Sequence, residues 1–210
     1  MHITEVDERD SRWENPSARY RMYSFSGPDL RVSTHDYTDV DLGDVLAAGA
    51  RGDRADALWS LALVVDDSTH GRGLTWLTGM DYNDFPDTPA EWRARRVMQD
   101  RFLMAASQRG QNPPLLPDGR RVIRLFCDHG RDWPLWESFT DKYTMDPDDY
   151  GLSESLRTDL HAWNQTYQLA SLDDPPSPAW IEEGWRLFRM LRAEVDDFAE
   201  VRPEFDHGDS

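Results

Sequence analysis

The sequence predicts an α+β fold in which a small sheet is covered by several amphipathic helices, with a helical hairpin at the C-terminal end. Three observations lead to this prediction. Residues 121–127, RVIRLFC, form an apolar run that follows a Pro- and Gly-rich turn, which is typical of a strand. Residues 88–91, TPAE, are a typical helix start. Two amphipathic segments, 153–170 and 177–195, are separated by a short Pro-rich link, which favours two antiparallel helices.

Three elements are expected in the first part of the chain. Residues 19–26, RYRMYSFS, are aromatic and end at a Gly-Pro turn, so they predict a strand. Residues 41–50 predict a short helix that Asp41 could cap. Residues 53–65 have apolar side chains at helical spacing and predict a second helix, although their end, LALVV, could equally form a buried strand. The strands at 19–26 and 121–127 would make up the sheet.

A long helix should begin after Thr88, because the Thr88 hydroxyl can accept a hydrogen bond from the first turn and Glu91 can reach back. It should end near Arg109, with Gly110 as its C-terminal cap. The two C-terminal helices should pack together and onto the sheet through aromatic side chains of both helices, namely Trp163, Tyr167, Trp185 and Phe188.

We expect a single α+β domain over residues 19–200, preceded by a poorly ordered polar segment, 1–18, and followed by a frayed acidic tail, 201–210. No apolar run is long enough to span a bilayer, and the acidic start of the chain lacks the apolar stretch of a signal peptide. The single cysteine, Cys127, rules out an intrachain disulfide and fits a reducing compartment. These features predict a cytoplasmic protein that is a monomer or a weak homodimer.

The charge balance restricts the class of partner. The chain has 40 acidic and 23 basic side chains, for a net charge of −17, which argues against direct binding to nucleic acid or to an anionic membrane. Residues 88–131 carry four acidic and nine basic side chains between two acidic flanks, so we expect ion pairs within the molecule. The remaining excess of carboxylates would be available to a basic protein partner.

Candidate catalytic and metal-binding residues have simpler structural explanations. Cys127, Asp128 and His129 follow a predicted strand, and a hydrolase using Asp128 and His129 is one alternative. Neighbouring residues on a strand point to opposite faces, however, and cysteine is more often a core residue. The spacing of His35 and the nearby Asp36, Asp39 and Asp41 matches no common metal site. We therefore expect no catalytic residue, no bound metal and no organic cofactor.

Aromatic and acidic residues between the strand at 121–127 and the next helix are the candidate binding residues. Trp133 and Trp136 flank Pro134, and tryptophan often anchors protein interfaces. The nearby carboxylates would steer a basic partner, and they are Asp146, Asp148 and Asp149. The alternative is that the tryptophans cap the core while these aspartates cap and solvate a helix start.

A motif pattern runs through residues 125–210: a strand leads into D-x-G, then P-L-W, an L-S-x-x-L helix that ends in Trp, and a last helix with Gly and several leucines. Its residues are Asp128, Gly130, Pro134, Leu135, Trp136, Leu152, Ser153, Leu156, Trp163, Gly184 and Leu191. This pattern resembles small acidic actinobacterial proteins of the polymorphic-toxin immunity type. The resemblance covers about the last 85 residues, and it implies an inhibitor that neutralises a toxin.

The leading hypothesis is therefore a non-enzymatic immunity or antitoxin-like protein that blocks a basic toxin or nuclease. A phage-type nucleic-acid mimic is an alternative, because two sets of aspartates at near-regular three-residue spacing could imitate phosphates. These are Asp36, Asp39, Asp41 and Asp44 in one set, and Asp81, Asp84 and Asp87 in the other. A hydrolase and a helical scaffold protein remain further alternatives.

Overall fold

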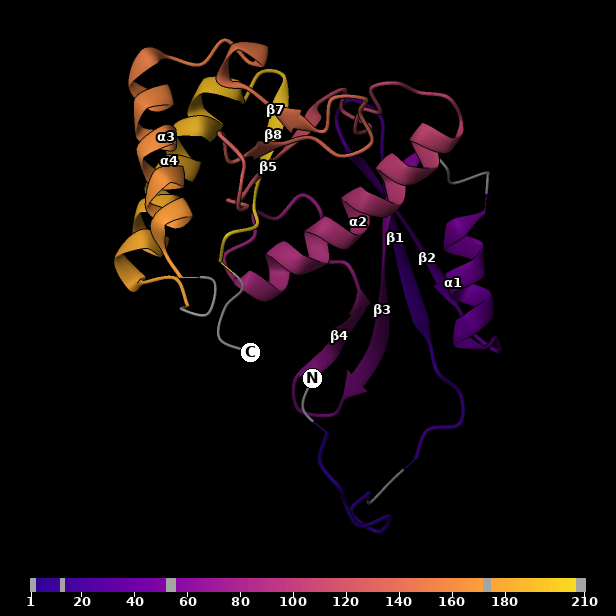
Figure 1. The fold of residues 1–210 in the computed structure, drawn as a ribbon. Coiled ribbons are helices and arrows are strands. Elements are labelled where there is room, and N and C mark those ends of the chain that lie inside the picture. Colours follow the sequence, from indigo (N-terminus) through magenta and orange to yellow (C-terminus); the bar gives the residue numbers. More distant parts are fainter. Residues whose placement is uncertain (1–2, 12–13, 52–55, 172–174, 207–210) are drawn as a thin grey trace.

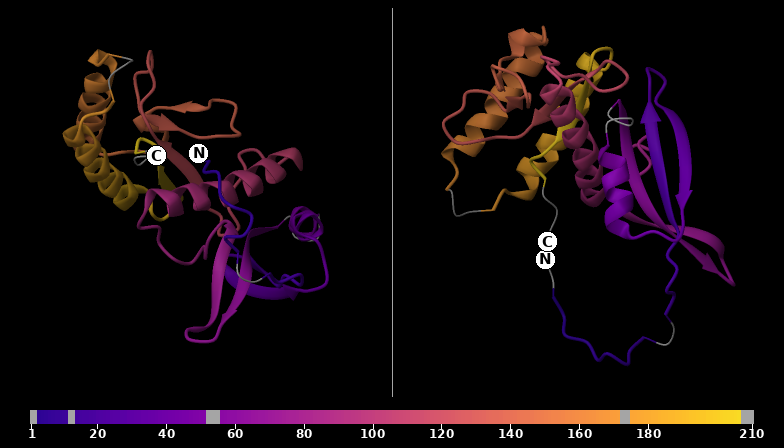
Figure 2. Two further views of the ribbon diagram at one scale, coloured as in Figure 1. Left: turned by 90° about the horizontal axis from the view of Figure 1, so that it is seen from below. Right: turned by 90° about the vertical axis from the view of Figure 1, so that its right-hand side faces the viewer.

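The computed structural model describes residues 3–11, 14–51, 56–171 and 175–206, and it contains two separate four-stranded sheets (Figure 1). The mixed content of helices and strands confirms the predicted α+β class. Helix α2, Pro89–Gln108, lies between the two sheets and contacts strands of both. Viewed from below, the N-terminal sheet and the C-terminal helices lie on opposite sides of α2 (Figure 2).

The N-terminal sheet is antiparallel with the strand order β2-β1-β3-β4. Its strands are β1, Tyr20–Ser26; β2, Arg31–Tyr37; β3, Ala57–Asp67; and β4, Gly71–Thr78. Helix α1, Leu42–Ala50, packs Val45 with Met22 and Trp59 on one face of this sheet. On the other face, α2 packs Met98 and Phe102 with buried residues of β1 and β3.

The C-terminal sheet has the order β7-β6-β5-β8, and β5 is parallel to the edge strand β8. Its strands are β5, Arg121–Leu125; β6, Leu135–Trp136; β7, Thr144–Met145; and β8, Ala199–Pro203. A short 3₁₀ helix, η2, covers Pro147–Asp149. Helices α3, Glu154–Leu169, and α4, Pro178–Val195, lie side by side and share the largest hydrophobic core with β5 and β8 (Figure 1).

Local capping signals predicted the helices well. The Thr88 side chain accepts from the Glu91 N–H, and the Glu91 carboxylate accepts from the Thr88 N–H, so the expected capping box is present. Ser153 and Ser177 cap α3 and α4 through their hydroxyls. The helix expected at 41–50 is present, although the Asp41 side chain makes no capping hydrogen bond. The strand at 19–26 is confirmed, and the strand expected at 121–127 is present but ends at Leu125.

The helix predicted over 53–65 is wrong over the described residues, since β3 occupies Ala57–Asp67 and the alternative of a buried strand is correct. Because α1 covers one face of β3 and α2 the other, this strand is apolar on both faces and lacks an alternating pattern. Residues 53–55 lie outside the described part of the chain. The strands at 19–26 and 121–127 also belong to different sheets, not to one.

The ends of the chain differ in part from the expectation. The tail expected at 201–210 is structured up to residue 206, because Val201–Pro203 belong to β8 and Phe205 is buried in the core. Residues 207–210 lie outside the described part of the chain, as do residues 1–2 and 12–13. Among the described residues, no helix is long and apolar enough to cross a membrane.

A buried charged cluster joins α2 to β8. The Glu200 carboxylate on β8 accepts hydrogen bonds from Arg95, which pairs through Nε and Nη2, and from Gln99 at 2.7 Å. The Tyr82 hydroxyl donates to the same carboxylate at 3.1 Å, and Arg120 approaches it at 3.5 Å. The side chains of Arg95 and Glu200 are only 9% and 10% exposed, so this pair lies almost wholly out of water.

A close approach of the two C-terminal helices depends on Gly184. A Cβ atom at this position would lie 2.7 Å from the Phe205 ring and 2.8 Å from the Trp163 ring. Trp163 stacks on Trp180 with ring centroids 4.5 Å apart, and each indole N–H donates to the backbone carbonyl of the other residue. The predicted packing role of Trp163 in the helical hairpin is therefore confirmed.

We expect E200Q to lower the free energy of unfolding by about 3–5 kcal/mol, because it leaves the buried Arg95 guanidinium without its counter-charge. Urea unfolding followed by circular dichroism measures this change. The matched control is D66N, which removes one partner of the exposed Asp66–Arg72 pair. D66N should change stability by less than about 1 kcal/mol. Equal effects of the two substitutions would contradict a structural role for the buried pair.

The Arg95–Glu200 pair also predicts that the free energy of unfolding depends on pH. Burial opposes ionisation of Glu200, but the hydrogen bond and charge of Arg95 outweigh it and hold the pKa of Glu200 below its ordinary value of 4.5. Such a carboxylate stabilises the fold above pH 4.5, and the contribution is lost as the pH falls through the lowered pKa. The difference in unfolding free energy between wild type and E200Q should therefore narrow in acid, and a constant difference would contradict this.

W163A should destabilise the protein by about 3–5 kcal/mol, because it removes a large buried ring and leaves a cavity. Trp163 is 3% exposed, whereas Leu169 at the end of the same helix is 86% exposed. L169A is therefore the matched control, and it should leave the urea midpoint nearly unchanged. A wild-type midpoint for W163A would show that the stacked pair contributes little to the hairpin.

Candidate functional site

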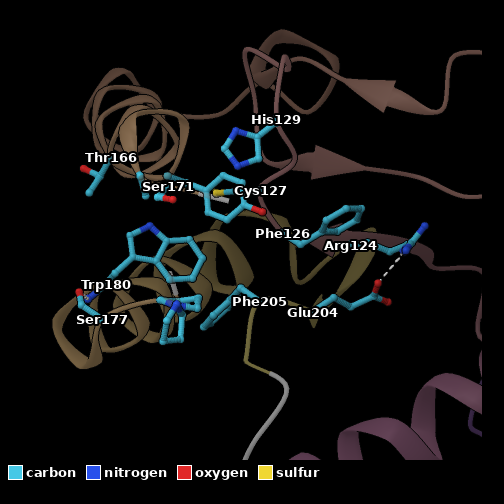
Figure 3. Close-up of a pocket in the computed structure, with 14 residues that line it drawn as sticks. Arg124, Phe126, Cys127, His129, Thr166, Ser171, Ser177, Trp180, Glu204 and Phe205 are labelled. Carbon is cyan, nitrogen blue, oxygen red and sulfur yellow. Dashed lines mark hydrogen bonds and ion pairs between the residues drawn. The ribbon is translucent and has the colours of Figure 1, made fainter. Parts of the chain in front are cut away.

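A cavity of about 830 Å³ opens in the C-terminal half, between the ends of β5 and β8, the end of α3 and the start of α4 (Figure 3). Its size lies in the range of small-molecule and side-chain binding pockets, about 300–1,000 Å³. The lining residues are Arg124, Phe126, Cys127, His129, Thr166, Tyr167, Ala170, Ser171, Pro175, Pro176, Ser177, Trp180, Glu204 and Phe205. We call this cavity the C-terminal pocket.

Aromatic rings form much of the wall of the C-terminal pocket. The Tyr167 ring lies 5.6 Å from the ring of Trp180 and 4.7 Å from the imidazole of His129. Phe205 meets the Trp180 ring edge-on, with centroids 6.2 Å apart. Because Trp180 stacks on Trp163 behind it, this wall is held from the core side and is fixed in place.

An ion pair supplies the polar end of the C-terminal pocket. Arg124 donates to the Glu204 carboxylate at 2.7 Å, and it also donates to the hydroxyls of Ser138 and Tyr143. Burial opposes ionisation of Glu204, but the bond from Arg124 and the charge of Arg202 lower the pKa of this carboxyl. The pocket therefore has a charged pair at one end and an aromatic wall elsewhere, an arrangement suited to binding.

Of the two residues of the hydrolase alternative, His129 lines the C-terminal pocket, whereas Asp128 is not among its lining residues. Cys127 is buried, as expected, and burial raises the pKa of its thiol far above the ordinary value, so the thiol stays protonated. Among the described residues, no hydrogen bond joins the His129 ring to the Asp128 side chain. The ring instead contacts Tyr167. A nucleophile activated by a neighbouring base needs a hydrogen bond between the two side chains, whereas the protonated Cys127 thiol is buried.

The two tryptophans predicted to bind a partner lie in different environments. Trp136 on β6 is 2% exposed; its ring stacks on Phe126 at 4.7 Å, and its indole N–H donates to the Phe126 carbonyl. Trp133 is partly exposed, and its ring lies 5.3 Å from His161 on α3. Trp136 therefore supports the surface from beneath, while Trp133 presents part of its ring to solvent.

The three predicted aspartates are exposed and lie together, but each already has a cationic partner. Asp146 and Asp149 form the capping box of η2, and both accept from Lys142. Asp148 accepts from Arg157 on α3, while its side chain remains 76% exposed. Asp146 and Asp149 therefore cap the 3₁₀ helix η2, whereas α3 is capped by Ser153. Asp148 has the most exposed carboxylate of the three.

Tyr143 is a further aromatic residue of this segment that reaches the surface. It is 44% exposed, and its ring packs edge-on against Trp136 at 5.4 Å. Its backbone has a φ of +59°, which L-residues rarely adopt, so the hairpin between β6 and β7 turns sharply here. Strand β8 was not predicted, and Phe205 follows it. The position of Phe205 in a pocket was therefore not predicted either, because no local periodicity indicates it.

Two aspartates of the nucleic-acid-mimic alternative already accept hydrogen bonds within the molecule. Asp36 accepts hydrogen bonds from both Arg19 and Arg21, and the bond from Arg21 holds the pKa of Asp36 far below its ordinary value. Asp81 accepts from the backbone N–H of Asn83 in a turn. In the described part of the chain, no group of three or more His, Cys, Asp or Glu residues is arranged to hold a metal ion.

Residues 121–202 match the model of the Serratia CdiI immunity protein-like family. The matched segment runs from β5 into β8, and it includes α3, α4 and most of the lining of the C-terminal pocket. Residues 1–120 lie outside the match. No curated protein matches the chain. The C-terminal region is thus similar to an immunity-protein family, a likeness that supports a toxin-immunity role and the binding of a toxin partner.

Proposed function

We propose that this protein is a cytoplasmic immunity-type inhibitor that binds and neutralises a basic toxin or nuclease through an acidic, aromatic-rich surface. The observation that carries the proposal is the match of residues 121–202 to the Serratia CdiI immunity protein-like family. The net charge of −17 supports a basic partner, since complementary charge speeds association and disfavours other partners.

The contact surface that we propose is the segment between β5 and α3. Trp133 and the three aspartates, Asp146, Asp148 and Asp149, would touch the partner, while the buried Trp136 holds Phe126 and Tyr143 in place beneath it. The cationic side chains that pair with these aspartates do not prevent contact between the aspartates and a partner. Lys142 is 46% exposed, and exposed ion pairs contribute less than about 1 kcal/mol. An arginine or lysine of the partner can therefore share or replace these contacts.

Inhibition of this kind requires no chemical step. The protein would occupy a basic cleft of the toxin and keep substrate phosphates out of it. Charges at the rim of such an interface chiefly set the rate of association, whereas a partly buried aromatic ring chiefly sets the rate of dissociation. The proposed surface contains both kinds of residue within one short segment.

The proposal can be tested by capture of the partner. The full chain, immobilised by a terminal tag, is incubated with extract of its own source cells at low and moderate salt, and retained proteins are identified by mass spectrometry. We expect one stoichiometric basic protein, which is toxic when produced alone and harmless when produced together with this chain. A retained partner that is acidic or non-toxic, or the absence of a stoichiometric partner at low salt, would contradict the proposed function.

D148N should slow association with the captured toxin and flatten its dependence on salt, because Asp148 has an exposed carboxylate outside the η2 capping box. Association rates measured by surface plasmon resonance over a salt series test this expectation. D66N removes an equally charged, exposed aspartate from the N-terminal sheet and should have a smaller effect. Equal rates for D148N and wild type at low salt would place the contact surface elsewhere.

W133A should speed dissociation of the complex by roughly tenfold, as expected when an interface loses an aromatic anchor. The association rate should change little, because no charge is altered. L169A, on the neighbouring helix α3, is the control for a lost exposed apolar side chain. An unchanged dissociation rate for W133A would show that Trp133 lies outside the contact.

A further inference from the structure

The N-terminal half contains a second pocket, which lies outside the segment that matches the immunity-protein family. A pocket of about 450 Å³ opens between the end of α1, the start of β3 and the second half of α2. Its walls are largely apolar and include Ala50, Trp59, Phe102 and Met104. The guanidinium of Arg101 on α2 provides a charged group in this wall. We call this cavity the Arg101 pocket.

The Arg101 guanidinium is fixed in position by neutral groups. Its central carbon lies 3.6 Å from the centroid of the Trp59 ring. Its Nη2 donates to the Trp59 carbonyl at 2.8 Å, and its Nη1 donates to the Thr78 hydroxyl at 3.3 Å. The Nε atom is buried and has no hydrogen-bond partner among the described residues. Since a guanidinium has five N–H donors, these contacts leave several of them unused.

Arg101 differs in this respect from the other partly buried arginines of the molecule. Arg95, Arg120 and Arg124 each pair with a carboxylate, which raises the pKa of each guanidinium despite burial. No ion pair joins Arg101 to a carboxylate in the described part of the chain. Burial alone lowers the pKa of Arg101 to about 10. Among the described residues, therefore, no carboxylate supplies a counter-charge to the Arg101 guanidinium.

We propose that the Arg101 pocket binds a small organic carboxylate, whose anionic end pairs with the Arg101 guanidinium and whose apolar body lies against Trp59, Phe102 and Met104. Charge complementarity determines the class of ligand, because a partly buried cation without a paired acid is stabilised by an anion that brings its own hydrogen-bond acceptors. The apolar walls and the volume of the pocket fit a small molecule with a compact aryl or alkyl body. Arg109 lies at the same pocket and pairs with Asp56 at 3.6 Å.

The test uses the full chain and two matched probes, 4-phenylbutyrate and its neutral amide, 4-phenylbutanamide. We expect isothermal titration to show that the acid binds roughly tenfold or more tightly than the amide, since hydrogen bonds to a charged group are the stronger ones. The Nε–Hε NMR signal of Arg101, assigned by its loss in R101K, should shift with the acid. Equal affinities, absence of binding by the acid at millimolar concentration, or an unmoved Arg101 signal would overturn the proposal.

Variants distinguish the effect of the Arg101 charge on binding from the effect of a general loss of structure. R101M should abolish the preference for the acid over the amide, whereas R157M, which removes an arginine on α3, should retain it. Thermal unfolding of each variant shows whether it folds, and the comparison of the two probes on wild-type protein tests the proposal even if R101M is unstable. A preference that persists in folded R101M would overturn it. These outcomes are independent of toxin binding, which the proposed function assigns to the C-terminal half.

Discussion

The contact of Glu200 with Arg95 connects the two halves of this molecule, and much of the remaining architecture depends on it. Each sheet has a hydrophobic core, and α2 contributes side chains to both cores and contacts strands of both sheets. A buried charge must be paired to be tolerated. The pair therefore specifies which residues of α2 and β8 face one another. Apolar packing would fix this alignment less strictly. A second pair, Arg202 with Asp100 at 2.8 Å, repeats the same link further along both elements.

The distribution of charge explains how a strongly acidic chain can fold around a basic middle. Arginines of α2 and β5 are matched by carboxylates from distant segments, including Glu137, Glu200 and Glu204. These carboxylates are buried and contribute to the structure. The carboxylates that remain on the surface produce the outward negative field that a basic partner would meet. Arg101 is the contrasting case, since its guanidinium is partly buried and has no paired acid among the described residues.

Local sequence signals determined what could be predicted. Thr88, Ser153 and Ser177 begin helices through contacts within a few residues, so the pattern is visible in the chain itself. Strand β8 could not be predicted in this way. Its Glu200 and Arg202 are polar in the sequence, and they are buried only because α2 supplies their partners. The C-terminal pocket could not be predicted for the same reason, because its wall combines β5, α3, α4 and Phe205. Trp133 and Asp148 were predicted as binding residues from residue type alone, and this stays a prediction.

The parallel pairing of β5 with β8 has a consequence for the order in which the molecule can form. Arg121 is matched with Ala199, so the two strands meet only after the whole of α3 and α4 has been placed between them. Contacts between residues so far apart in sequence slow folding, because a long loop must close first. Until then, β5 has an apolar edge with open backbone hydrogen-bonding groups, which is a site for unwanted association between chains. A cell that makes this protein in quantity would thus benefit from a chaperone that shields residues 121–125 during synthesis.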